Sequence, residues 1–218
     1  MIESRIPRLM ELAPDFEALS THGLLRLTDF TSRGKWVLLF SHPSDFTPVC
    51  STEFIEFARR QPDWDRLNLQ LIAVSIDSLP SHIAWVLDLE RLSGLKIAFP
   101  IIADLDQRVS QAYGLVHEAV SDTAAVRAVF VIDPRGLVRA LLYYPMQIGR
   151  NLDELVRLVE GLQLVDLNPV SCPANWLPGD PVLAPAPTTV EEAIKRTEGV
   201  AGLDVQSWYL STRALPVK

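Results

Sequence analysis

The fold of this chain is most constrained by two apolar runs, WVLLF at residues 36–40 and LQLIAVSID at residues 69–77. Neither run alternates between apolar and polar residues, so we expect two strands that are buried on both faces of a sheet. The segment between them carries Phe54 and Phe57 at helical spacing, and Pro62 should end or kink the helix that they predict. Buried strands joined by a helix are typical of an α/β domain.

The remaining patterns in the first three quarters of the chain fit a mixed sheet flanked by helices. An apolar stretch at residues 125–144 predicts a hairpin with its turn at residues 133–136. Two of the helix patterns end at a glycine, which favours the left-handed conformation of a helix C-terminus. The patterns predict extended segments at 24–30 and 97–104, and helices at 81–94, 107–113 and 152–162.

The composition and net charge of the chain limit the classes of protein to which it can belong. The chain has 218 residues, 48% of them hydrophobic, with a formal net charge of −7 and a sequence pI near 5.1. This acidic balance provides no basic surface for nucleic acid or for anionic membranes. No apolar run approaches the roughly 18 residues of a membrane span, and residues 1–16 lack the pattern of a secretory signal. Because two cysteines do not make a disulfide framework in a chain of this length, we expect a soluble cytoplasmic protein.

The composition changes near residue 166. Residues 168–187 are rich in proline and poor in periodic apolar positions; one short helix pattern follows at 190–200 and a strand-like end at 204–218. A segment this rich in proline does not readily form a core of its own. We therefore predict two domains, residues 1–165 and residues 166–218, the second an arm that packs against the first domain or against a partner subunit.

One of the two cysteines, Cys50, follows the buried run 36–40 at the point where a polar turn begins. Pro48 suits the first turn of a helix, because its missing N–H would have no partner there. With Thr47 as the N-cap, Cys50 falls in that first turn, where backbone N–H groups and the helix dipole favour a thiolate. A free cysteine is more often a small hydrophobic side chain, but this position is typical of a nucleophile.

The segment FSHPSDFTPVCSTEF resembles the active-site signature of the peroxiredoxins, with Pro43, Thr47 and Cys50 in the pattern Pro-x-x-x-Thr-x-x-Cys. The similarity continues through VSIDS, SHIAW, FPIIAD, RAVFVIDPRG and Gly149-Arg150-Asn151, and it is greatest with the 1-Cys subfamily. The resemblance implies a thioredoxin-like fold, with a central mixed sheet flanked by helices and a small C-terminal dimerisation arm. It also implies thiol-dependent reduction of hydrogen peroxide and organic hydroperoxides.

The resemblance gives a role to each matching residue. Cys50 corresponds to the peroxidatic cysteine, whose thiolate attacks the peroxide and becomes a sulfenic acid. Thr47 corresponds to the hydroxyl that orients peroxide and sulfur, and Arg127 to the arginine that stabilises the thiolate and polarises the peroxide. Pro43 corresponds to the residue that shields the sulfur from water, and Arg150 to a second arginine near the site.

Glu53 is expected to orient the arginines, and His42 matches the Ser-His-Pro of the subfamily, where it can also be a packed, hydrogen-bonded side chain. The implied mechanism requires neither a metal nor an organic cofactor, because a thiolate and donors aimed at oxygen suffice. The sequence gives no reason to expect a metal site, since it has no Cys-x-x-Cys and its histidines are scattered. The histidines are His22, His42, His82 and His117.

The second cysteine departs from the 1-Cys pattern. Members of that subfamily usually have another residue at the place of Cys172, whereas Val170-Ser171-Cys172-Pro173 is similar to the segment around the resolving cysteine of the typical 2-Cys peroxiredoxins. The resemblance implies that Cys172 of a partner subunit forms a disulfide with the oxidised Cys50. Cys50 must then leave its helical turn, because a disulfide requires Cα atoms within about 7 Å. The alternative is a 1-Cys enzyme in which Cys172 takes no part.

The expected partners are hydrogen peroxide or an alkyl hydroperoxide, a thiol reductant (a thioredoxin-like protein or a small thiol), and a second copy of the chain, with a ring of dimers left open. Two other function classes remain alternatives. A thioredoxin-like thiol oxidoreductase normally has Cys-x-x-Cys, but threonine occupies the first of these places. A chaperone-like oligomer without catalysis would be favoured by the loss of Cys50, Thr47 or Arg127, and all three are present.

Overall fold

The chain divides into two compact units, Met1–Leu152 and Asp153–Lys218. The computed structural model describes residues 6–215. Residues 1–5, which belong to the N-terminal segment without a secretory-signal pattern, lie outside the described residues. So do residues 216–218 of the predicted strand-like end. The boundary precedes the one expected at residue 166 and groups the helix predicted at 152–162 with the C-terminal unit. Among the described residues, no helix is both long and apolar enough to cross a membrane.

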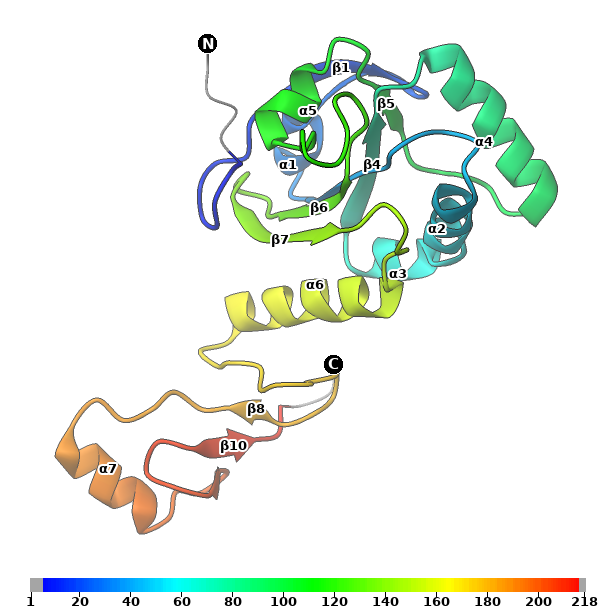
Figure 1. The fold of residues 1–218 in the computed structure, drawn as a ribbon. Coiled ribbons are helices and arrows are strands. Elements are labelled where there is room, and N and C mark those ends of the chain that lie inside the picture. The colour runs from blue at the N-terminus through cyan, green and yellow to red at the C-terminus, as the bar shows by residue number, and fades with distance from the viewer. Residues whose placement is uncertain (1–5, 216–218) are drawn as a thin grey trace. The chain divides into compact units, whose positions relative to one another are not determined.

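The described residues of the first unit form a seven-stranded mixed sheet with the order β2-β1-β5-β4-β3-β6-β7. Figure 1 labels β1, β5, β4, β6 and β7 of this sheet. At its centre, β3 (Trp36–Ser41) pairs in parallel with β4 (Leu69–Ser75) and antiparallel with β6 (Arg127–Ile132). β4 also pairs in parallel with β5 (Ile101–Ala103), and β6 pairs antiparallel with β7 (Val138–Tyr144). The two predicted buried strands are thus neighbours, and the predicted hairpin is confirmed.

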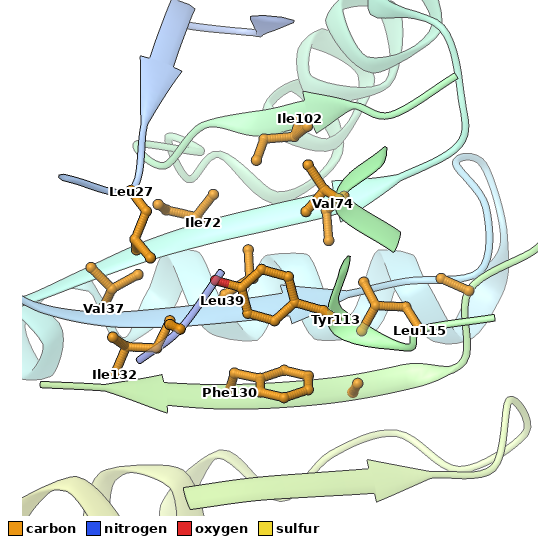
Figure 2. Packing of buried hydrophobic residues seen from close by; sticks show 14 of the residues in the cluster. Leu27, Val37, Leu39, Ile72, Val74, Ile102, Tyr113, Leu115, Phe130 and Ile132 are labelled. Atoms are coloured by element: carbon orange, nitrogen blue, oxygen red, sulfur yellow. The ribbon is translucent and has the colours of Figure 1, made fainter. Parts of the chain in front are cut away.

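The central strands are buried on both faces because the sheet separates two apolar layers. Val37 and Leu39 of β3 belong to one layer, together with Phe130 of β6 (Figure 2). Phe40, whose side chain points to the opposite face, stacks on Phe57 with 4.2 Å between ring centroids. This burial on two sides accounts for the absence of alternation in the sequence of the strand.

Proline residues set the helices that follow β3. α2 (Pro48–Arg59) has a proline at its first position. The helix α2 ends before Arg60, and the chain continues as α3 (Gln61–Arg66), whose first turn contains Pro62. The expected interruption at Pro62 is confirmed, and its physical reason is that proline is tolerated only in the first turn of a helix.

Capping residues set the next two helices. α4 (Leu79–Ser93) begins after Ser78, whose side chain accepts a hydrogen bond from the N–H of Ser81, and it ends at Gly94. α5 (Arg108–Tyr113) ends at Gly114. Both glycines adopt the left-handed conformation that closes a helix. The helices predicted at 81–94 and 107–113 are confirmed.

The prediction of a strand at residues 24–30 is wrong for the second half of that segment. The strand β2 (Gly23–Arg26) pairs with β1 (Glu17–Ser20), which the sequence patterns did not predict, and the chain then enters the short helix α1 (Thr28–Thr31). Oδ2 of Asp29 accepts a hydrogen bond from the backbone N–H of Arg26 at 2.8 Å. Such a local bond from a short acidic side chain competes with strand pairing and favours a turn.

The C-terminal unit has a small core, although its composition suggested none. Val170, Trp176 and Val182 are buried together. α6 (Leu152–Leu167) begins at the boundary and is longer than the predicted helix, and the helix predicted at 190–200 is confirmed as α7 (Val190–Thr197). The strands form a sheet in the order β8-β10-β9, with β8 at Val182–Leu183, β9 at Asp204–Val205 and β10 at Ser211–Arg213.

Candidate active site

Cys50 lies in the first turn of α2, after the loop that leaves the end of β3. Thr47 is the N-cap residue, with an extended backbone (φ −106°, ψ 147°), and Pro48 follows it as the first helical residue. The Cys50 side chain is 0% exposed. The position expected for Cys50 at the N-terminus of a helix is therefore confirmed, and the sulfur is enclosed by protein.

Arg127, the first residue of β6, contacts the sulfur directly. Its Nη1 donates to Sγ of Cys50 at 3.2 Å and to Oε2 of Glu53 at 2.8 Å. Its Nε donates to the carbonyl oxygen of Met146 at 2.9 Å. These bonds fix the plane of the guanidinium group beside the sulfur, which a flexible ammonium group would not do.

Arg150 binds the same carboxylate as Arg127. Its Nε and its backbone N–H each donate to Oε1 of Glu53 at 2.8 Å, and its Nη2 donates to Oε2 at 2.6 Å. Its Nη1 donates to the carbonyl oxygens of Ser41 at 3.0 Å and Ala128 at 3.2 Å. The structure therefore brings together four residues singled out from the sequence: Cys50, Glu53, Arg127 and Arg150.

Glu53 is a buried acceptor shared by two cations. Burial would raise the pKa of its carboxyl group, but the charge and hydrogen bonds of Arg150, and then the charge of Arg127, lower it, and the resulting pKa lies below the usual value. The group is therefore a carboxylate. Two guanidinium groups and one carboxylate leave an excess of positive charge beside the sulfur, which is complementary to a negative sulfur or oxygen.

The Thr47 hydroxyl has a different partner from the one expected of an N-cap. It donates to the carbonyl oxygen of Ser44 at 2.9 Å and makes no capping hydrogen bond. A hydroxyl has one proton and two lone pairs, so Thr47 can still accept a hydrogen bond. Pro43 is half-buried in the same loop.

Cys172 belongs to the C-terminal unit, where it is half-buried and not in a disulfide. A Cβ atom on Gly161 of α6 would lie 3.6 Å from its sulfur and 3.6 Å from the Trp176 ring, both ordinary van der Waals distances, so Gly161 packs beside the thiol. Burial raises the pKa of the Cys172 thiol, and the nearby charge of Arg157 offsets this only in part. Cys172 is therefore held as a thiol at neutral pH.

The sequence patterns did not predict a buried polar cluster formed by His42, Asp45 and His82. Oδ1 of Asp45 lies 3.0 Å from Nε2 of His42, and its Oδ2 lies 2.8 Å from Nδ1 of His82. All three residues are at most 5% exposed. The two histidines meet because one follows β3 and the other lies in α4, which follows the neighbouring strand β4. The histidines are scattered along the sequence, but the fold brings two of them, His42 and His82, to the same carboxylate.

These three residues form the kind of group that can hold a metal ion. In this structure the ring nitrogens that face Asp45 are engaged in hydrogen bonds to it, and the Ser81 hydroxyl also donates to Asp45 Oδ2 at 2.8 Å. The other ring nitrogen of His82 lies 3.2 Å from the carbonyl oxygen of Ile102. The facing groups thus satisfy one another within the chain.

Comparisons with known proteins agree with this arrangement. The AhpC/TSA family matches residues 9–141, and the C-terminal domain of 1-Cys peroxiredoxin matches residues 161–199. Peroxiredoxin 2 of Caldanaerobacter subterraneus subsp. tengcongensis is 49% identical over 94% of this chain and 92% of its own length. The peroxiredoxin of Aquifex aeolicus is 46% identical over 94% of this chain and 96% of its own length.

The chain is also similar to solved structures of peroxiredoxins. A yeast mitochondrial 1-Cys peroxiredoxin is similar with a TM-score of 0.83 and 35% identity over 96% of this chain and 100% of that one. A cysteine-to-serine mutant of peroxiredoxin 6 of Arenicola marina has a TM-score of 0.84 and 34% identity, covering 97% of this chain and 99% of that one. The thioredoxin-like α/β fold expected from the sequence is therefore confirmed.

Fold and site together define the class of thiol-dependent peroxidases, enzymes that reduce peroxides and are restored by thiol reductants. The chain belongs to the peroxiredoxin family. The resemblance stated from the sequence is confirmed, including the similarity of the C-terminal part to that of 1-Cys members.

Proposed function

We propose that Cys50 is the peroxidatic cysteine of this enzyme. Its thiolate attacks the terminal oxygen of a hydroperoxide: the S–O bond forms, the O–O bond breaks, and the departing alkoxide or hydroxide takes up a proton. The sulfur is oxidised to a sulfenic acid and the peroxide is reduced to an alcohol or water. The observation that carries this proposal is the 3.2 Å contact between Nη1 of Arg127 and Sγ of Cys50.

The contacts of the arginines support a division of roles. Arg127 donates to the sulfur and, as the O–O bond breaks, to the negative charge that develops on the departing oxygen. Glu53 orients Arg127 through the 2.8 Å bond from its Nη1. Arg150 holds Glu53 in place through three donors.

Thr47 and Pro43 complete the proposed site. Because the Thr47 hydroxyl gives its proton to the carbonyl oxygen of Ser44, it meets a bound peroxide as an acceptor of the peroxide O–H. Pro43 has no backbone N–H, and its proposed role is to keep water from the sulfur. The substrates would be hydrogen peroxide and organic hydroperoxides.

The test of the proposal is thiol-dependent peroxide consumption by wild type, Cys50→Ser and Cys172→Ser, with circular dichroism to confirm folding. We expect Cys50→Ser to lose turnover completely, because serine supplies no thiolate. Cys172→Ser should still consume peroxide in its first turnover. Sustained turnover by a folded Cys50→Ser protein would contradict the assignment of Cys50 as the peroxidatic cysteine.

We further propose that Cys172 of the partner subunit resolves the sulfenic acid. Its sulfur attacks the sulfenic sulfur, an S–S bond forms and water leaves; a thioredoxin-like protein or a small thiol then reduces the disulfide. The similarity of Val170-Ser171-Cys172-Pro173 to a resolving segment supports this role. In the alternative 1-Cys cycle an external thiol attacks Cys50 directly; the yeast relative is resolved through glutathione/thioredoxin systems.

The proposed assembly is a homodimer in which residues 166–218 reach the partner subunit, alone or within a ring of dimers. The match of residues 161–199 to the C-terminal domain of 1-Cys peroxiredoxin supports it. We also retain a cytoplasmic location as a proposal, which fractionation of the source cells tests. Detection of the protein outside the cytoplasmic fraction would contradict it.

A further inference from the structure

The cluster of His42, Asp45 and His82 takes no part in the proposed chemistry, yet it holds the loop that carries Thr47. We infer that Asp45 and His82 are positioning residues for the peroxidase reaction: their buried hydrogen-bonded pair fixes the loop between β3 and α2 so that Thr47 and Cys50 meet the peroxide together. The inference rests on the roles proposed above for Cys50 and Thr47.

The contacts of His82 hold its ring in place. Nδ1 lies 2.8 and 3.0 Å from the two carboxylate oxygens of Asp45, and Nε2 lies 3.2 Å from the carbonyl oxygen of Ile102. Both ring nitrogens of His82 are thus within hydrogen-bond distance of an oxygen atom, which holds the ring in one orientation. Burial would raise the pKa of Asp45, but the hydrogen bonds from His42 and His82 hold it well below its usual value, so Asp45 is a carboxylate.

His42 is the neutral member of the cluster. Burial lowers its pKa, and Nε2 donates to Oδ1 of Asp45 at 3.0 Å. Nδ1 therefore carries a lone pair, and it has no hydrogen-bond partner among the described residues. The ring packs against Phe54 of α2 and Trp85 of α4, at 4.8 and 5.2 Å between ring centroids. The cluster thus holds one carboxylate between two buried histidine rings.

Contacts of Ser44 and Asp45 connect the Asp45–His82 pair to Thr47. The Thr47 hydroxyl donates to the carbonyl oxygen of Ser44, and the backbone N–H of Asp45 donates to Oδ2 of Asp77 at 3.0 Å. Phe46, between Asp45 and Thr47, has φ 53°, a left-handed conformation that is unfavourable for a residue with a side chain. Contacts from outside the loop must therefore hold this conformation, and those of the buried Asp45–His82 pair are among them.

The arginines reach the sulfur from a different part of the fold. Arg127 comes from β6, and Arg150 follows β7, whereas His82 comes from α4. Loss of the Asp45–His82 pair should therefore leave the charge around Cys50 in place and disturb the alignment of the loop. Reactions that need only the sulfur should be spared, while the reaction that needs an oriented peroxide should slow.

The experiment compares two reactions of Cys50 in the reduced full-length protein at one pH. One is oxidation by hydrogen peroxide; the other is alkylation by iodoacetamide, followed by the mass of the Cys50 peptide so that Cys172 does not interfere. For His82→Gln and Asp45→Asn we expect the peroxide rate to fall on the order of ten- to a hundred-fold, as for a small misplacement of reacting groups. Alkylation should change little, and the control His22→Gln, at an exposed histidine, should change neither.

A folded His82→Gln variant with the wild-type peroxide rate would overturn the inference, and so would equal losses in both reactions. Thermal unfolding shows which variants fold. Ser81→Ala removes one donor that holds the Asp45 carboxylate beside His82, so it loosens the pair without removing it and allows the same comparison if the other variants do not fold. It should show a smaller loss confined to the peroxide reaction; no such loss in folded Ser81→Ala would count against the inference.

A double variant tests whether the pair acts as a unit. Asp45→Asn with His82→Gln should be no slower with peroxide than the slower single variant, because either change already disrupts the pair. Losses that multiply would contradict the inference. Failure of the proposed function is distinguishable, since it would appear as turnover by Cys50→Ser whatever the His82 variants do.

Discussion

The Nη1 atom of Arg127 lies 3.2 Å from the sulfur of Cys50, although 77 residues separate them in the chain. Cys50 follows the end of β3, and Arg127 is the first residue of β6. Because β3 and β6 pair antiparallel, the end of one lies beside the start of the other. The pairing of two central strands thus brings the donor to the sulfur.

Replacement of Arg127 by lysine should slow the oxidation of Cys50 by about 10²–10³-fold, the usual effect of removing one oriented donor. An ammonium group keeps the charge, but it cannot hold the sulfur, Glu53 and the Met146 carbonyl in the fixed geometry of a guanidinium. Stopped-flow measurement of the second-order rate with hydrogen peroxide checks this. Arg135→Lys, at an exposed arginine, is the control, and equal rates for the two variants would refute the prediction.

Replacement of Glu53 by glutamine should destabilise the protein by about 3–5 kcal/mol, because it leaves two buried arginines without their shared carboxylate. Urea unfolding at neutral pH gives the free energy of unfolding. Glu56→Gln is a matched control on the same helix; its ion pairs with Arg59 and Arg60 are at the surface and are worth about 0–1 kcal/mol. A Glu53→Gln protein as stable as Glu56→Gln would disprove the expectation.

The stability difference between wild type and Glu53→Gln should depend on pH. The folded-state pKa of Glu53 is depressed below its ordinary value of 4.5, so its ion pairs contribute stability that is fully present above that value. This contribution is lost as the pH falls through the folded-state pKa. Urea unfolding of both proteins between about pH 3 and pH 7 should show a gap that is constant near neutrality and narrows below pH 4.5. A gap that widens on acidification would contradict the sign.

Replacement of Cys172 by serine should prevent a disulfide between subunits. Peroxide-treated wild type should run as a dimer on a non-reducing denaturing gel, whereas Cys172→Ser should run as a monomer and accumulate sulfenic or sulfinic acid at Cys50. Intact mass and peptide mapping check the oxidation state. Wild type that stays monomeric with Cys50 oxidised and Cys172 a free thiol would assign the enzyme to the 1-Cys mechanism.

Truncation after Leu164 should abolish the proposed dimer, since it removes Val170, Trp176 and Val182, which form the small core of the C-terminal unit. Sedimentation measures the mass, and circular dichroism reports whether the first unit remains folded. Full-length protein at the same concentration is the reference. A folded, fully active monomer produced by the truncation would show that the tail is dispensable.

Local signals predicted much of the fold. Burial on both faces showed in the runs at 36–40 and 69–77, and Pro48 indicated the start of α2. The error at 24–30 arose because the apolar residues there continue past the point where Asp29 bonds to the backbone and turns the chain. Apolar spacing records burial, but it does not record which backbone groups a nearby side chain satisfies.

The sequence by itself determined the central strands, most of the helices, the family signature and the identity of Cys50 as the candidate nucleophile, because periodicity and capping act over a few residues. Tertiary structure alone decided that Glu53 meets Arg150 across 97 residues and that Asp45 meets His82 across 37. Both contacts depend on the order of strands in the sheet. That order places the C-terminal ends of β3 and β4 beside each other and next to the N-terminal end of β6. That order is fixed by the packing of the whole domain, and no short segment of the chain encodes it.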